Sequence, residues 1–218
     1  MKKTSYVQTK LFLGCIWFVI QTACSTLAGT NGWISQDIGS GTRTPGTAVV
    51  DGTGTEAVFT LTGQGYIYGA VDSGQFYYQM PSGDVTLVAR VISQSGAASS
   101  SAKAGVMIRA KVDGHAANVF MAMTNSNGAA CQVRLTDGDA TTTSPLAAPY
   151  PQWVKVVRKG SEISGYISTN GKDWTRLGAP ITMKDWPEQI CLGLAATSNG
   201  PDVVTAKFDN VTLTPGAQ

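Results

Sequence analysis

The sequence is poor in the side chains that enzymes use most often for acid–base and metal chemistry. Its 218 residues include a single histidine, His115, and only 14% are charged. The glutamates Glu56, Glu162 and Glu188 do not form the strand motif that places two carboxylates across a glycosidic bond. No G-x-S-x-G motif accompanies His115, and one histidine with separated cysteines supplies too few zinc ligands. The composition therefore argues against a histidine-based hydrolase and against a zinc site.

The sequence also lacks helical periodicity from Trp33 onward. Short runs of β-branched and aromatic residues alternate instead with clusters of Gly, Asn, Asp and Ser, which is typical of strands joined by turns. We expect an all-β fold of two antiparallel sheets, and loops at 93–103 and 137–151. The clearest predicted strands are 56–62, 75–80, 84–93, 104–112, 117–124, 130–136, 152–159, 161–168, 190–198 and 203–213.

Only the N-terminus carries a long apolar run. Three lysines precede Leu11–Ile20, and small and polar residues follow, which is the layout of a secretory signal. Three outcomes remain open: lipidation at Cys24, cleavage after Ala28, or a retained membrane anchor. Each of them exports the protein, to the periplasm, the outer membrane or the outside. We therefore divide the chain into a leader, 1–28, and one domain, 29–218.

Basic residues are not in excess once the leader is set aside. The leader holds three of the 16 basic residues, so the 14 acidic ones slightly outnumber the rest. A nucleic-acid partner is therefore not expected. Cys131 and Cys191 lie outside the leader, and an oxidising compartment permits either a disulfide between them or two buried free thiols.

An Asn-Gly pair stands between two predicted strands in YISTNGKDWTRLG. Asn170 and Gly171 suit a type I′ turn, in which both central residues have positive φ. Trp174 then begins the return strand. We expect this tryptophan to pin the hairpin by packing across it, the alternative being an exposed platform for a ligand.

Several motifs together resemble a known family. KAGVMIR (103–109), VFMAMT (119–124), the block at 153–178, LGLAATS (192–198) and FDNVTL (208–213) resemble bacterial concanavalin A-like, laminin G-like domains. The nearest subgroup has no assigned function and is related to the "regulation of enolase" proteins. A similar sandwich follows the catalytic domain of some arabinofuranosidases and xylosidases.

The resemblance implies a two-sheet jelly roll that acts outside the cytoplasm as a carbohydrate-binding or adhesive module. It supplies no catalytic residues, so we expect a non-enzymatic protein that binds a glycan. The alternatives are an interaction or structural subunit that docks on an envelope protein and, ranked well below, a glycoside hydrolase. No cofactor is required.

A structural calcium ion is an open alternative, because such ions commonly join the loops of jelly rolls. The candidate ligands are Asp51, Glu56 and Asp209. Carboxylates in turns also cap backbone amides without any metal.

A ligand-binding face is predicted from aromatic and planar polar side chains, which hold sugars in proteins. In QFYYQM the alternation places Tyr77 and Gln79 on one side of a strand. If that side is the open face of a sheet, other long polar side chains would join it. The alternative is that the arginines only keep the sheet soluble. The candidate ligand-binding residues are Tyr77, Gln79, Arg90, Arg109, Gln132 and Arg134.

Overall fold

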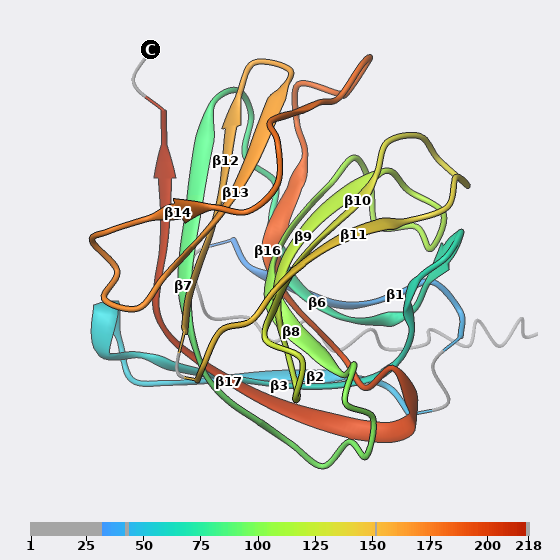
Figure 1. Ribbon diagram of the computed structural model, residues 1–218, viewed down its shortest axis with the longest axis vertical. Coiled ribbons are helices and arrows are strands. Elements are labelled where there is room, and N and C mark those ends of the chain that lie inside the picture. Colours follow the sequence, from blue (N-terminus) through green and yellow to red (C-terminus); the bar gives the residue numbers. More distant parts are fainter. Residues whose placement is uncertain (1–31, 42–43, 151, 217–218) are drawn as a thin grey trace, which may run out of the picture.

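The computed structural model describes residues 32–41, 44–150 and 152–216, and the leader with Cys24 lies outside this part. Two large antiparallel sheets form a sandwich, so the predicted fold class is confirmed. Figure 1 shows β7, β12 and β13 of one sheet on the left and β8–β11 of the other on the right. A 3-10 turn, η1 (Gly54–Glu56), interrupts the strands. No helix in the described ranges has the length and apolarity to span a bilayer.

The seven-stranded sheet carries the candidate site. The strand order is β1 (Ile34–Ile38), β6 (Gly74–Gln79), β16 (Cys191–Thr197), β8 (Lys103–Arg109), β9 (Asn118–Thr124), β10 (Ala129–Arg134) and β11 (Thr142–Leu146).

The eight-stranded sheet closes the other side of the sandwich. The order is β14 (Thr175–Arg176), β13 (Glu162–Ser168), β12 (Gln152–Lys159), β7 (Val85–Ser95), β17 (Gly200–Pro215), β3 (Val58–Gly65) and β2 (Thr47–Asp51), and β15 (Ile181–Thr182) pairs with β13.

The main core lies between the two sheets. Alternation along each strand turns every second side chain inward. Val106 and Met121 of the seven-stranded sheet meet Leu87, Val154 and Phe208 of the other sheet in this cluster, and all five are essentially without solvent exposure. The eight-stranded sheet keeps a partly polar outer side, as the alternation in its strands predicts.

The outer face of the seven-stranded sheet, which points away from the sandwich, is also largely buried. Phe76, Met107 and Phe120 form a second apolar cluster there with Ile67. Because both sides of β8, β9 and β16 are covered, these strands read as nearly continuous apolar runs rather than as alternating ones.

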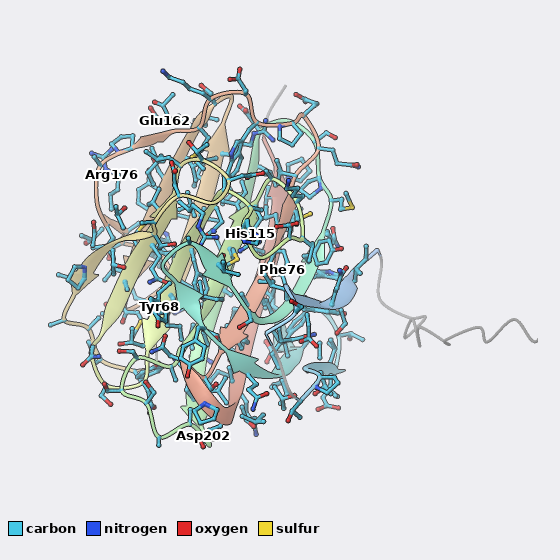
Figure 2. The ribbon with its side chains drawn as sticks, turned by 90° about the vertical axis from the view of Figure 1, so that its right-hand side faces the viewer. Tyr68, Phe76, His115, Glu162, Arg176 and Asp202 are labelled. Carbon is cyan, nitrogen blue, oxygen red and sulfur yellow. The ribbon has the colours of Figure 1, made fainter. Side chains whose placement is uncertain are left out.

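A short hairpin provides much of this cover. It joins β4 (Ile67–Tyr68) to β5 (Val71–Asp72), and we call residues 66–73 the cover hairpin. The backbone amide of Asp72 donates to the carbonyl of Gly114 at 2.7 Å, which ties the hairpin to the loop between β8 and β9. Figure 2 looks onto this side of the molecule, with Tyr68 on the near face.

The segment 137–151 was predicted to be a loop, and this prediction is wrong in part. Its residues Thr142–Leu146 form β11, which pairs with β10 at the edge of the sheet. All five residues are exposed and polar residues or Pro145 dominate, so the strand lacks the apolar alternation that would have revealed it. Pro145 has no backbone N–H, which limits further pairing at this edge.

Cys131 and Cys191 are free, buried thiols, so the disulfide alternative is wrong. Cys131 belongs to the core between the sheets, whereas Cys191 belongs to the cluster on the outer face. Their strands β10 and β16 are also separated by β8 and β9. Two sulfur atoms on opposite faces of a sheet cannot reach the bonding distance of a disulfide.

Candidate functional site

A buried carboxylate organises one end of the outer face. Asp72 of the cover hairpin accepts hydrogen bonds from Arg134 Nη2 at 2.7 Å and from Arg134 Nη1 and Arg109 Nη1 at 2.8 Å. Asn118 Nδ2 adds a fourth, at 3.1 Å. The side chains of Asp72, Arg109 and Arg134 have no solvent exposure. These strongly desolvated charges are stabilised by pairing and hydrogen bonding to one another.

Most of the remaining donors of the two arginines are also occupied. Arg134 donates to the carbonyls of Gly69 and Asp139, each at 2.9 Å. Arg109 donates to the carbonyls of Lys111 and Asp113. Because both guanidinium groups are buried and paired, the prediction that Arg109 and Arg134 present themselves on an open face is wrong: they anchor loops to the sheet.

Tyr77, Gln79 and Arg90 do not join a common ligand face either. Tyr77 is 6% exposed, lies in the core between the sheets and stacks on Trp33, with the ring centroids 5.0 Å apart. Gln79 is half-buried on the same strand. Arg90 stands on the other sheet, where Nε donates to Asp209 Oδ1 at 2.7 Å. The predicted face is therefore dispersed over two sheets and the core.

Gln132 does line an open hollow, at the other end of the outer face. The hollow has a volume of about 340 Å³ and lies beside the cover hairpin. Lys103, Thr124, Ala130 and Gln132 line it from β8, β9 and β10, and their registers place them on the outer side of the sheet. The rest of the lining is Tyr68, Ser101, Asn127, Ala129, Thr143, Pro145 and Asn199. We call this the outer-face hollow.

Two polar side chains in the wall of the outer-face hollow are incompletely paired. Lys103 is 5% exposed, and Asn199 Oδ1, at 3.1 Å, is its one hydrogen-bond acceptor within the described ranges. Gln132 is 3% exposed. Its Nε2 donates to Thr143 Oγ1 at 3.1 Å, and its buried Oε1 has no partner. A flipped amide would exchange the two ends but would still leave one of them without a partner, because Thr143 is the one hydrogen-bond partner of this side chain among the described residues.

The burial of Lys103 has an electrostatic consequence. Loss of hydration disfavours the ammonium form and lowers the pKa of Lys103 from 10.5 to about 8, although the charge of Asp72 acts in the opposite direction. Lys103 thus remains mostly cationic at neutral pH, without a carboxylate in contact.

Two other hollows offer fewer unpaired polar side chains for recognising a ligand. One of about 420 Å³ opens between the sheet edges beside β11 and is lined by Val133, Leu135, Leu177 and Pro180, among others. Another, of about 670 Å³, lies among loops near Trp186. The first is an apolar groove, and Leu135 on its rim is 56% exposed.

The calcium candidates do not assemble into a recognisable site. Asp209 is paired with Arg90 on the eight-stranded sheet. Asp51 and Glu56 are exposed, at the end of β2 and in η1. Among the described residues, no group of three or more His, Cys, Asp and Glu side chains could hold a metal ion. Calcium stays a prediction without a supporting cluster.

The 169–174 loop is not the predicted type I′ turn. Gly171 has φ +71°, but Asn170 is absent from the described residues with positive φ. Instead Asn170 Oδ1 accepts from the amides of Lys172 and Asp173, each at 2.9 Å. Ser168 Oγ accepts from the amide of Gly171 at 2.9 Å. The side chains replace the backbone bonds of a two-residue turn, as in an Asx turn.

Trp174 is half-buried and its face is occupied. Lys155 Nζ lies 4.0 Å from the centroid of the Trp174 ring and 4.6 Å from that of Tyr166 on β13. Lysine above aromatic rings is a stabilising arrangement. Because Lys155 covers the ring, the geometry favours the pinning interpretation over the platform.

Sequence reasoning missed most of the outer-face hollow. Alternation predicts the correct side of β10 for Gln132, whereas Lys103 and Tyr68 are not among the predicted ligand-binding residues. YIYGAVD does contain a signal for the cover hairpin, namely Gly69 between two short apolar runs. Nothing in the local sequence indicates that Asn199, 96 residues after Lys103, lies beside it.

Comparisons with known proteins support the fold. No protein-family model matches the chain, and no curated protein matches it. A functionally unknown protein from Saccharomyces cerevisiae is similar, with a TM-score of 0.60 and 19% identity, over 79% of this chain and 97% of that one. The carbohydrate-binding module CBM66 from Bacillus subtilis has a TM-score of 0.49 and 15% identity, over 84% and 94% of the two chains.

A variant of the GH43 protein BlXynB from Bacillus licheniformis is also similar. Its TM-score is 0.50 at 14% identity, over 73% of this chain. The alignment covers 33% of the GH43 chain, so this protein spans about a third of that neighbour. At such identities the likeness is one of fold: a concanavalin-like jelly-roll sandwich.

Proposed function

We propose that this protein is a non-catalytic recognition module that binds carbohydrate in the outer-face hollow. One observation carries the proposal: the unpaired amide end of Gln132 and the underused ammonium of Lys103 lie in the wall of an open hollow. Buried polar groups without partners are costly in a folded protein. A ligand that supplies the missing partners would offset that cost.

Sugars fit the chemistry of this hollow. A hydroxyl group can donate and accept, so it satisfies the open end of Gln132 whichever way the amide is oriented. Tyr68 is 56% exposed at the rim and offers a ring for the apolar face of a pyranose. Ala129, Ala130 and Pro145 supply an apolar surface beside these polar groups.

The lining also supports recognition without hydrolysis. Glycoside hydrolysis usually requires two carboxyl groups on either side of the scissile bond. The described lining of the outer-face hollow includes neither aspartate nor glutamate. The carboxylate of Asp72, on the same face of the sheet, is buried and ion-paired with Arg109 and Arg134, so it does not reach the hollow as a free acid or base.

The proposed location is outside the cytoplasm, with the N-terminal segment as signal or anchor. We also propose that the protein is related to the subgroup of the "regulation of enolase" proteins.

A second candidate function is docking on an envelope protein. The apolar groove beside β11, with exposed Leu135 on its rim, favours this alternative.

A glycan array on the purified protein tests the proposal, with two variants to locate any binding. Gln132→Leu keeps the approximate size of the side chain and removes the amide, so it should abolish or strongly weaken binding. Gln189→Leu is the matched control, because Gln189 is exposed and lies outside the described lining. Binding that is equal in both variants, or no binding at all, would contradict the proposal.

A further inference from the structure

Among the described residues, the buried charged side chains on the outer face of the seven-stranded sheet are three cations, Lys103, Arg109 and Arg134, and one carboxylate, Asp72. Asp72 is shared by Arg109 and Arg134, so this cluster is itself cationic. Lys103 adds another buried ammonium on the same side of the sheet as Met107 and Arg109, which follow it by four and six residues along β8. No described carboxylate forms an ion pair with Lys103, whose hydrogen bond goes to the neutral amide of Asn199.

Two side chains in the wall of the outer-face hollow have hydrogen-bonding groups that are not used. Lys103 Nζ has three N–H donors and one observed acceptor, so it can donate to another group. Gln132 has one amide end open. Desolvation makes an ammonium without a counter-charge costly, and an anion that enters the hollow would reduce this cost.

We infer that the outer-face hollow selects acidic sugars, with a carboxylate or sulfate group held by Lys103 and a hydroxyl group held by Gln132. This inference rests on the proposed function and specifies the class of its ligand. Inorganic phosphate would engage Lys103 but would leave the ring of Tyr68 unused. A neutral sugar would satisfy Gln132 but would leave Lys103 without a counter-charge.

Isothermal titration with matched oligosaccharides tests the inference. The acidic ligand is a short oligogalacturonate, and its carboxyl-reduced form is the neutral ligand of the same length and linkage. A sulfated galactose oligosaccharide distinguishes carboxylate from sulfate. We expect at least one acidic ligand to bind about tenfold or more tightly than the neutral one, the ratio typical of a charge-assisted hydrogen bond.

The variant Lys103→Met should remove this preference. Methionine resembles lysine in length, and replacing a desolvated charge by an apolar group of similar shape does not threaten folding. Affinity for the acidic ligand should therefore fall to that of the neutral one, so that the ratio of the two affinities approaches one. Lys207→Met is the control, because Lys207 is exposed and lies on the other sheet.

The outcomes separate the inference from the function on which it rests. Equal affinity for acidic and neutral ligands, lost together in Gln132→Leu, would overturn the selection of acidic sugars and leave carbohydrate binding intact. An acidic preference that survives Lys103→Met would also overturn it. Failure of every oligosaccharide to bind would contradict both proposals.

Discussion

Asp72 is the residue on which the outer face depends. It belongs to the cover hairpin, yet its hydrogen-bond partners come from β8, β9 and β10. One carboxylate thereby fixes the hairpin over the sheet and compensates two buried guanidinium groups. The same contact leaves Tyr68, four residues before Asp72 in the hairpin, at the rim of the outer-face hollow.

Replacement of Asp72 by asparagine should be strongly destabilising. The variant removes the negative charge but keeps the shape, and it leaves Arg109 and Arg134 buried without a counter-charge. We expect a loss of about 3–5 kcal/mol in the free energy of unfolding, measured in urea.

Asp209→Asn is the matched comparison for Asp72→Asn. It breaks the pair with Arg90, whose side chain is 35% exposed. Such a partly solvated pair contributes only about 1 kcal/mol or less. Equal losses for the two variants would show that the Asp72 cluster is not the buried anchor described above.

The lowered pKa of Lys103 predicts a pH-dependent stability. Below pH about 8 Lys103 is charged in both the folded and unfolded states. Between about 8 and the ordinary value of 10.5 the unfolded chain binds the proton and the folded chain has lost it, so this group contributes stability that rises with pH. Asp72, Arg109 and Arg134 are the charged groups that share its face of the sheet.

Unfolding in urea at pH 7 and pH 9.5 measures this effect. The stability of Lys103→Met relative to the wild type should be greater at pH 7, where the wild type carries the unfavourable buried charge, and the difference should narrow at pH 9.5. A difference that is constant across this range would mean that Lys103 titrates as an exposed lysine does.

Residue-level chemistry was the part least accessible from the sequence. The alternation of Cys131, Gln132, Val133 and Arg134 correctly separated the two faces of β10. It could not show that the polar face is covered, because the cover comes from residues 66–73, about 60 positions earlier. An arginine on a strand therefore looked like a surface residue, whereas Arg134 is an internal one.

At the scale of elements, the strands with strong β-branched runs were predictable and the irregular ones were not. β12 lies where the alternation of QWVKVVRK placed it, at Gln152–Lys159. The exposed edge strand β11 carries little apolar signal, and the strands of the cover hairpin, with two residues each, are too short for alternation to show. Their pairing depends on partners elsewhere in the sheet, which a local pattern does not contain.

Trp174→Ala tests the role of the 169–174 loop. Because Trp174 is half-buried beneath Lys155, we expect a stability loss of about 2 kcal/mol, below the usual range for a fully buried tryptophan. Sugar affinity should be unchanged, since the outer-face hollow lies on the other sheet. Loss of affinity with unchanged stability would restore the platform interpretation.

Gly171→Val provides an internal comparison within this loop. Gly171 has φ +71°, and a Cβ atom there would lie 2.9 Å from the indole of Trp153. A β-branched residue is strained in this backbone region and would also clash. Melting temperature should fall in this variant, again with sugar affinity retained in the folded fraction.

At the scale of the whole molecule, the seven-stranded sheet is the central layer, with a core on each side. Cys131 and Cys191 lie in different cores, so the sandwich does not rely on a covalent link between them. Burial raises the pKa of the Cys131 thiol to about 11, which suppresses the reactive thiolate.

Reducing agent should therefore leave the melting temperature unchanged. Iodoacetamide should label Cys131 only after unfolding, as followed by mass spectrometry of the peptides that contain Cys131 and Cys191. A melting temperature that falls on reduction, or a peptide pair linked by a disulfide, would contradict the arrangement of the two thiols.

The central claim, that carbohydrate binds in the outer-face hollow, is tested most directly by nuclear magnetic resonance during titration with an acidic oligosaccharide. The side-chain amide signals of Gln132, Asn127 and Asn199 should shift together, because all three residues line the hollow. The indole signals of Trp153 and Trp174, on the other sheet, should stay in place. Shifts of these indoles without shifts of the three amides would place the binding site on the opposite face and contradict the account.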